Sequence, residues 1–263
     1  MIKLSPSNHI DKKKKRMKFL GIIPARYASS RFPGKPLIDI EGKTMIQRVY
    51  EQVKKSTKLN EVVVATDDSR IKQAVLSFGG NVVMTSGHHQ SGTDRCAEVI
   101  AQYQDYDIAV NIQGDEPFIN PEQIDLLASC FADPNTQIAT LVKEIIQDDE
   151  LFNVNIPKVV RNAKGEAIYF SRQTIPFLRG VQKEEWLQKQ KFYKHIGIYA
   201  YQVDTLKALT HLPISMLEEA EALEQLRWLE NGYAIKTAIT NHETVAVDTR
   251  EDLDKILKLF FNK

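Results

Sequence analysis

A loop of charged and small residues follows the first apolar run of the sequence. The run 19–23 is ended by Pro24, and the stretch 25–36 then supplies backbone amides, two arginines including Arg26, and Lys35. Donors of these kinds at the end of a strand suit a polyphosphate. We therefore predict a phosphate-binding loop here, and the spacing alone also leaves open a surface turn rich in proline and arginine.

The loop differs from two common phosphate-binding motifs. A Walker loop needs Gly-x4-Gly-Lys-Ser/Thr, whereas Lys35 is followed by Pro36 and the second glycine is missing at the required spacing. The loop also lacks the Gly-x-Gly-x-x-Gly turn that binds dinucleotides. The sequence thus favours another class of nucleotide-binding protein.

A pair of carboxylates follows a second apolar run. Asp115 and Glu116 come directly after the expected strand 108–113. Carboxylates at the carboxyl end of a strand are well placed to hold a metal ion over bound phosphates. A solvated aspartate that caps the turn before Pro117 is the alternative interpretation.

Regular alternation of strands and helices positions both features. Apolar runs predict strands at 19–23, 61–65, 81–85 and 108–113, and helical spacing predicts helices near 45–53, 69–78 and 93–103. Such alternation is typical of an α/β fold with a mainly parallel sheet and helices on both faces.

The pattern changes after residue 137. Short strands are expected at 137–142, 158–161, 167–170 and 193–201, followed by one helix over 217–230 and a final helix from about residue 250. We therefore expect a single domain over 18–263 with a smaller antiparallel extension at about 138–201. Residues 1–17 are expected to form a basic, disordered tail.

Composition and charge limit the classes of function. The chain has 43% hydrophobic and 26% charged residues, which is typical of a globular protein, and a formal net charge of +1 gives no overall attraction to nucleic acid. The basic run Lys12–Arg16 leaves a nucleic-acid-binding arm as an alternative. Two cysteines and no apolar run of about 20 residues favour a soluble protein in the reducing cytoplasm.

The loop and several later motifs together resemble a known family. Further matching motifs stand at 89–95, 110–117, 153–160, 169–172, 195–199, 223–227 and 247–249. In this order they resemble the acidic-sugar cytidylyltransferases, and most closely the members that use 3-deoxy-manno-octulosonate (Kdo). The resemblance implies a Rossmann-like nucleotide-diphospho-sugar transferase fold.

The resemblance also implies roles for individual residues. Asp115 and Asp248 would be Mg²⁺ ligands and, with Lys35, catalytic residues. The CTP-binding set would contain Pro24, Ala25, Arg26, Lys35, Ser91, Arg95 and Gln113. For Ser91 and Arg95 the alternative is a role at the start of a helix, because a serine or threonine before Asp94 fits an N-cap.

A third set of residues is implied to bind the sugar. This set contains Gln113, His195, Tyr199, Glu224 and Gln225. His195 lies in an apolar strand, where a core histidine is the ordinary interpretation, and Glu224 could simply pair with Arg227 on a solvated helix face.

The implied reaction is transfer of CMP from CTP to Kdo, with release of pyrophosphate, which activates Kdo for lipopolysaccharide synthesis. The resemblance further implies a homodimer. From the net charge of +1 we expect no nucleic-acid partner, and from the short apolar runs we expect no membrane insertion. Alternatives left open are activation of sialic acid or 8-amino-Kdo, nucleotidyl transfer to a sugar 1-phosphate, and an inactive sugar-nucleotide-binding protein. Ala200 and Trp228 depart from the pattern that the family leads us to expect.

Overall fold

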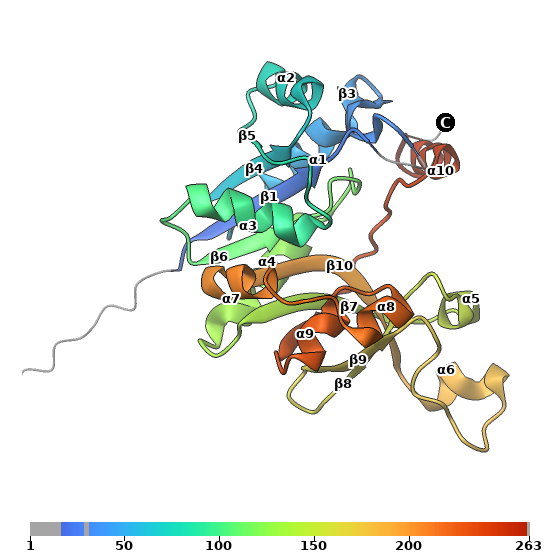
Figure 1. Ribbon diagram of the computed structural model, residues 1–263. Helices are drawn as coiled ribbons and strands as arrows, with labels where there is room; N and C mark the ends of the chain where they lie inside the picture. Colours follow the sequence, from blue (N-terminus) through green and yellow to red (C-terminus); the bar gives the residue numbers. More distant parts are fainter. Residues whose placement is uncertain (1–16, 29–31, 262–263) are drawn as a thin grey trace, which may run out of the picture.

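The computed structural model describes residues 17–28 and 32–261 (Figure 1). The basic tail predicted for residues 1–17 therefore lies outside the described residues, apart from Met17. Arg31 of the predicted phosphate loop lies outside them as well. All other predicted site residues are described.

Most strands of the described residues join one sheet. Its path runs in the order β11, β7, β10, β6, β1, β4, β5, and β8 and β9 attach beside β10. The bounds of these strands are β1 Phe19–Ala25, β4 Glu61–Thr66, β5 Val82–Met84, β6 Ile108–Asn111, β7 Ile138–Ile145, β8 Lys158–Arg161, β9 Ala167–Ser171, β10 Phe192–Gln202 and β11 Ile235–Ile239. The short strands β2 Asp39–Ile40 and β3 Lys43–Thr44 form a separate hairpin.

The sheet is mainly parallel, as predicted. Strand β1 pairs in parallel with both β4 and β6, β4 with β5, and β11 with β7. Antiparallel pairing joins β10 to β6, β7 and β8, and β8 to β9. The expected antiparallel extension thus continues the same sheet, and the loops after β1 and β6 leave the same edge because these strands are parallel neighbours.

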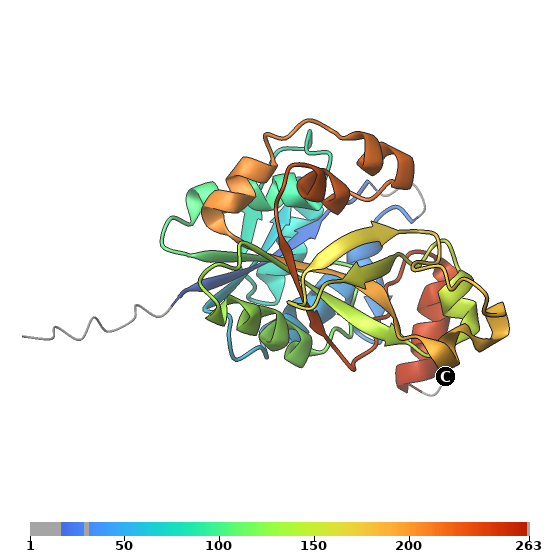
Figure 2. The ribbon, with the colours of Figure 1, turned by 90° about the horizontal axis from the view of Figure 1, so that it is seen from below.

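Helices cover both faces of the sheet, as Figures 1 and 2 show. One face carries α1 (Met45–Val53), α2 (Ser69–Ser77), α4 (Pro121–Ser129) and α10 (Arg250–Phe261); the other carries α3 (Gly92–Gln102), α7 (Val203–Leu209) and α9 (Gln225–Glu230). The remaining helices are α5 (Asp148–Phe152), α6 (Trp186–Lys189) and α8 (Met216–Glu221). Across the described residues, no helix combines the length and apolarity required to traverse a membrane.

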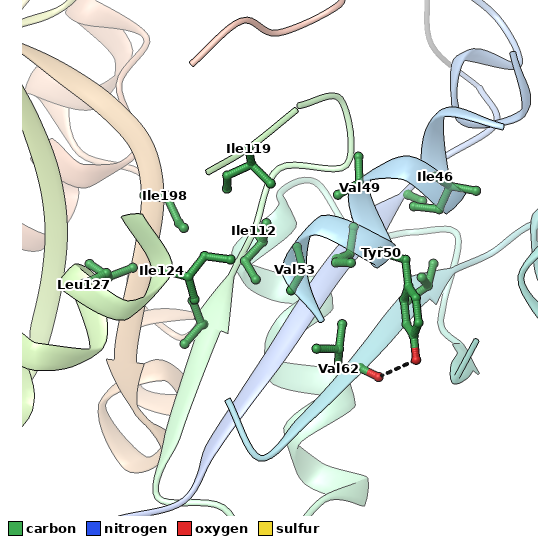
Figure 3. Packing of buried hydrophobic residues seen from close by; sticks show 14 of the residues in the cluster. Ile46, Val49, Tyr50, Val53, Val62, Ile112, Ile119, Ile124, Leu127 and Ile198 are labelled. Carbon is green, nitrogen blue, oxygen red and sulfur yellow. Dashed lines mark hydrogen bonds between the residues drawn. The ribbon is translucent and has the colours of Figure 1, made fainter. Parts of the chain in front are cut away.

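Helix α1 shows how the sequence pattern builds the first core. Its apolar residues Ile46, Val49 and Val53 are fully buried at helical spacing, in one core cluster with Ile112 and Ile124. Figure 3 shows Val53 beside Ile112. Burying one such side chain contributes about 1.5–3 kcal/mol. The helix begins after the β2–β3 hairpin, and its Met45 N–H donates to the Ile38 carbonyl at 2.8 Å, so its packing anchors the end of the segment that carries Lys35.

The single helix predicted over 217–230 is wrong. The chain forms α8 and α9 instead, separated at Ala222, whose φ of 49° lies in the left-handed region. This conformation strains a residue with a Cβ atom. Arg172 offsets the strain because its Nε donates to the Glu221 carbonyl at 2.6 Å and its Nη2 to the Ala222 carbonyl at 3.2 Å.

Candidate active site

The site lies where neighbouring strands β1 and β6 end. Strand β1 continues through Pro24 to Ala25, beyond the predicted end of the run at Pro24, and the loop leaves it at Arg26. Gln113, Gly114 and Asp115 follow β6. The two segments touch so closely that a Cβ atom at Gly114 would lie 2.6 Å from the Pro24 carbonyl oxygen. Only glycine fits this approach, which sets Asp115 beside the predicted phosphate loop.

The Lys35 amino group joins two carboxylates from distant parts of the chain. Lys35 Nζ lies 2.8 Å from Asp115 Oδ2 and 3.1 Å from Asp248 Oδ1, although the three residues span 213 positions. The lysine side chain is only 14% exposed. All three predicted catalytic residues therefore meet at one point.

Local geometry holds Lys35 in place. Gly34 has φ 73°, a left-handed conformation that favours glycine, and its N–H donates to the Tyr27 carbonyl at 2.9 Å. The next residues, Lys35–Leu37, form a single 3-10 turn in which Pro36 is buried. The turn directs the lysine toward the carboxylates.

Backbone pairing brings Asp248 to Asp115. The Val247 N–H donates to the Asp115 carbonyl at 2.9 Å, and the Val247 side chain is fully buried in the core. The aspartate that follows Val247 is thereby set next to the loop after β6. The spacing of the residues in the sequence could not by itself predict that Asp115 and Asp248 lie close together.

The carboxylate pair fits a hard divalent cation. Asp115 and Asp248 both reach one cationic nitrogen, that of Lys35, which shows that their oxygens can surround a positive charge. Within 17–28 and 32–261, no group of three or more His, Cys, Asp or Glu side chains could hold a metal. Mg²⁺ commonly takes one or two protein carboxylates and completes its shell with phosphate and water.

Glu116, the other half of the predicted carboxylate pair, points into the protein instead. It is 6% exposed, and its Oε2 has no hydrogen-bond partner among the described residues. Burial and the neighbouring Asp115 charge raise the pKa of Glu116 to about 8. Asp115 is therefore the carboxylate of this pair that faces Lys35.

The predicted cytosine-reading segments also lie in contact. Arg26 Nη2 donates to the Ser91 carbonyl at 3.3 Å, and Gly92 approaches the Pro24 ring. The alternative role of Ser91 as a helix start is confirmed, because its Oγ accepts from the Asp94 N–H at 3.1 Å in a capping box. The Ser91 backbone stays beside the loop, and its role as a ligand remains a prediction.

Arg95 lies inside the protein. Its side chain is fully buried, and its guanidinium donates to Thr85 and, at 3.3 Å, to Asp67 Oδ2. The guanidinium thus links α3 to the loops that follow β4 and β5. Its predicted contact with CTP stays a prediction.

A β-bulge in β10 shapes the predicted sugar side of the site. The register between β10 and β7 shifts between Ile196 and Tyr199, and Gln113 Nε2 donates to the Gly197 carbonyl at 2.8 Å within the shift. Thr140 Oγ1 donates to the Ile198 carbonyl at 2.8 Å. The bulge ties Gln113, which follows β6, to the strand that carries His195.

His195 lies between Thr140 and two aromatic rings. Its Nε2 is 3.1 Å from Thr140 Oγ1, and its ring contacts Phe170 and Tyr199. Burial lowers the pKa of His195 to about 4, so the ring is neutral near pH 7. The core-histidine interpretation describes this environment well, and sugar binding by His195 stays a prediction.

Helix α9 brings the remaining predicted sugar residues to this strand. Trp228 packs edge-on against Tyr199, with ring centroids 5.1 Å apart. Gln225 is 5% exposed, and its Nε2 has no hydrogen-bond partner among the described residues. The buried Gln225 amide therefore has a donor left over for a ligand.

Glu224 is held both by α3 and by Arg227 of α9. Thr93 Oγ1 donates to Glu224 Oε2 at 2.9 Å, and Arg227 Nη2 reaches Glu224 Oε1 at 3.4 Å. Burial raises the pKa of Glu224. The alternative pairing of Glu224 with Arg227 is present, but with side chains 29% and 13% exposed the pair is partly buried and does not lie on a fully solvated face.

The sequence reasoning missed three residues that shape the site: Gly114, Thr93 and Asp252. Gly114 and Thr93 stand inside motifs already noted, but neither motif reveals a contact. Asp252 carries a local signal, because Thr249 and Asp252 have the spacing of a capping box at the start of a helix.

Comparison with known proteins gives a consistent set of matches. The family model described as Cytidylyltransferase matches residues 20–244. The 3-deoxy-manno-octulosonate cytidylyltransferase of Parabacteroides distasonis is 62% identical over 252 residues, which cover 94% of this chain and all of that protein. The protein of the same name from Phocaeicola vulgatus is 61% identical, over 90% of this chain and 95% of its own.

A solved structure agrees with these sequences. The structure of CMP:2-keto-3-deoxy-manno-octonic acid synthetase complexed with CTP superimposes with a TM-score of 0.87 at 44% identity. The match covers 93% of this chain and 99% of that one. The predicted α/β nucleotidyltransferase fold is thereby confirmed.

Proposed function

The chain belongs to the cytidylyltransferase family, and we propose that it transfers CMP from CTP to Kdo, releasing pyrophosphate. The observation that carries the proposal is the meeting of Lys35, Asp115 and Asp248 beside the loop after β1. A relative that is 62% identical over its whole length bears the name of this activity. The product would supply activated Kdo for lipopolysaccharide synthesis.

The reaction is an in-line displacement at phosphorus. The anomeric oxygen of the sugar attacks the α-phosphorus of CTP and forms a new P–O bond, while the bond to the β-phosphate breaks and pyrophosphate leaves. The hydroxyl proton passes to water. Catalysis in such a transfer is mainly positioning and neutralisation of charge. Lys35 and Arg26 supply positive charge to the triphosphate.

Asp115 and Asp248 would hold Mg²⁺ in this scheme. When bound, the ion neutralises phosphate charge and acidifies the attacking hydroxyl. Asp115 and Asp248 would place the ion beside the triphosphate. Lys35, which contacts both carboxylates, would neutralise negative charge that the ion leaves on them or on the phosphates. His195 is a poor general base near pH 7 because its pKa is about 4, which agrees with a reaction that needs no histidine base.

The sugar would bind between β10 and α9. Gln225 offers a buried amide donor, and burial keeps the pKa of Tyr199 well above its usual value, so that its hydroxyl also remains a donor. Gln113 lies between this side and Asp115. These donors suit the hydroxyl groups and carboxylate of a sugar acid.

Pyrophosphate release tests the proposal. Purified protein is incubated with CTP, Mg²⁺ and Kdo, with ATP, sialic acid and 8-amino-Kdo as parallel substrates and the Asp115→Ala variant as a control. Release with CTP and Kdo alone supports the proposal. Release with another sugar acid would keep the reaction and replace Kdo as the proposed substrate. No release despite CTP binding would favour an inactive sugar-nucleotide-binding protein.

We also propose that the protein works as a homodimer in the cytoplasm. The part of the chain between residues 138 and 201 exposes large apolar side chains, among them Ile146, Val154, Ile168 and Phe177. Exposed apolar side chains of this size are candidates for burial between subunits. Light scattering would measure the mass, and a monomeric mass would contradict this part of the proposal.

A further inference from the structure

We propose that Asp252 is a positioning residue that sets the Asp248 carboxylate for metal binding. The inference rests on the proposed function, in which Asp248 is a Mg²⁺ ligand. It concerns a residue of helix α10 that has no direct contact with Lys35 or Asp115 among the hydrogen bonds described. Its action on the site would pass through the backbone of Asp248.

The Asp252 carboxylate holds the turn that carries Asp248. A single oxygen, Asp252 Oδ2, accepts from the Asp248 N–H at 3.2 Å, from the Thr249 N–H at 3.0 Å and from Thr249 Oγ1 at 3.0 Å. A capping aspartate usually serves the helix alone. Here one of its donors is the backbone of the predicted metal ligand itself.

Helix α10 is in turn fixed to the protein. Leu253 and Ile256 are buried in the core shared with α1. Near the end of the helix, the Phe260 ring stacks on Phe118 with centroids 4.0 Å apart, and Arg48 lies over the Phe261 ring at 5.0 Å. The backbone that carries Asp252 is therefore anchored to the core.

The same helix contacts both metal-carboxylate segments. Asp248 lies just before α10 and is held by Asp252, while Phe118 lies three residues after Asp115 and stacks on α10. Together with the bond from Val247 N–H to the Asp115 carbonyl, these contacts set the distance between the two carboxylates. Groups that orient metal ligands commonly change metal affinity or activity by about 10- to 100-fold when removed.

A purely structural cap would behave differently from a positioning residue. Loss of a cap lowers the free energy of unfolding by about 1 kcal/mol without changing metal affinity. A positioning residue changes the metal dependence itself. The test therefore compares metal affinity with stability in the same variants.

Three variants separate these roles. Asp252→Ala removes all acceptors, and Asp252→Asn keeps one oxygen that can accept the same bonds. Asp125→Ala is the matched control, because the Asp125 carboxylate also accepts from backbone N–H groups and a threonine hydroxyl, at Thr57, on a loop after the far end of α1. Each variant is measured by Mg²⁺ titration of pyrophosphate release, Mn²⁺ binding in the presence of CTP by electron paramagnetic resonance, and thermal unfolding.

We expect Asp252→Ala to raise the Mg²⁺ midpoint and the Mn²⁺ dissociation constant about tenfold. Asp252→Asn should restore most of this affinity, and Asp125→Ala should lower stability without shifting either midpoint. Equal Mn²⁺ affinity in Asp252→Ala and the unaltered protein overturns the inference. So does unchanged Mn²⁺ affinity in Asp248→Asn, because Asp248 would then be no ligand.

The two proposals fail in different ways. Absence of pyrophosphate release from the unaltered protein counts against the proposed function. The Mn²⁺ titration does not depend on turnover and still decides the role of Asp252.

Discussion

The most direct test of the site geometry is the Gly114→Ala substitution, which adds a single methyl group where the end of β1 and the loop after β6 meet. In Gly114→Ala the new Cβ would meet the Pro24 carbonyl oxygen at 2.6 Å, whereas ordinary contacts begin at 3.4 Å. The opposing atom belongs to the backbone and cannot rotate away. The loop after β6 and the end of β1 must therefore separate by roughly 0.8 Å, the difference between these distances.

This shift acts directly on the catalytic residues. Asp115 follows Gly114, and the chain from Pro24 leads into the loop with Arg26 and Lys35, so the carboxylate moves relative to the phosphate-binding donors. A misplacement near 1 Å can lower a rate about 100-fold. We expect turnover to fall by about that factor, while overpacking lowers stability by about 1–3 kcal/mol.

The assay is steady-state pyrophosphate release well below the unfolding temperature, with unfolding followed by circular dichroism. Each kcal/mol lost should lower the melting temperature by about 2–4 °C. Gly87→Ala is the control, since its Cβ would meet Asp67 at an ordinary 3.5 Å. Turnover of Gly114→Ala within about threefold of the unaltered protein would refute the reasoning, because about 0.8 Å at this point would then not matter.

Asp115→Ala should lower turnover by about 100-fold or more while CTP affinity changes much less; equal turnover with weakened CTP binding would contradict the metal role. Thr93→Val removes the donor to Glu224 Oε2 and should raise the KM for the sugar about tenfold, with the KM for CTP unchanged; a parallel rise in both would argue against a sugar-side role. His195 has a folded pKa of about 4, below its usual 6.5, so the unfolded chain binds more protons and the free energy of unfolding should fall by up to about 3 kcal/mol as pH drops from 6.5 toward 4. Urea unfolding of His195→Gln should show a smaller loss over that window, and an identical slope would contradict the burial argument.

The alternation of apolar runs and helical spacing was enough to predict the parallel sheet and most elements. Strand β1 and helices α1, α2 and α3 lie within one or two residues of their predicted bounds. These patterns are local, because each element must bury one face or stripe of its own residues. The same locality explains the wrong helix over 217–230, where Arg172 stabilises a break at Ala222 from a distant part of the chain.

For the site, too, the sequence determined some features and the tertiary structure determined others. Residue types and motif order in the sequence determined which side chains to consider, among them Lys35, Asp115 and Asp248. Only the tertiary structure decided that these three meet and that Arg95 is buried. Only it showed that Asp252 holds the turn of Asp248. The reason is physical: a motif restricts a few neighbouring residues, whereas the distance between two carboxylates far apart in the chain depends on every strand pairing and packed helix between them.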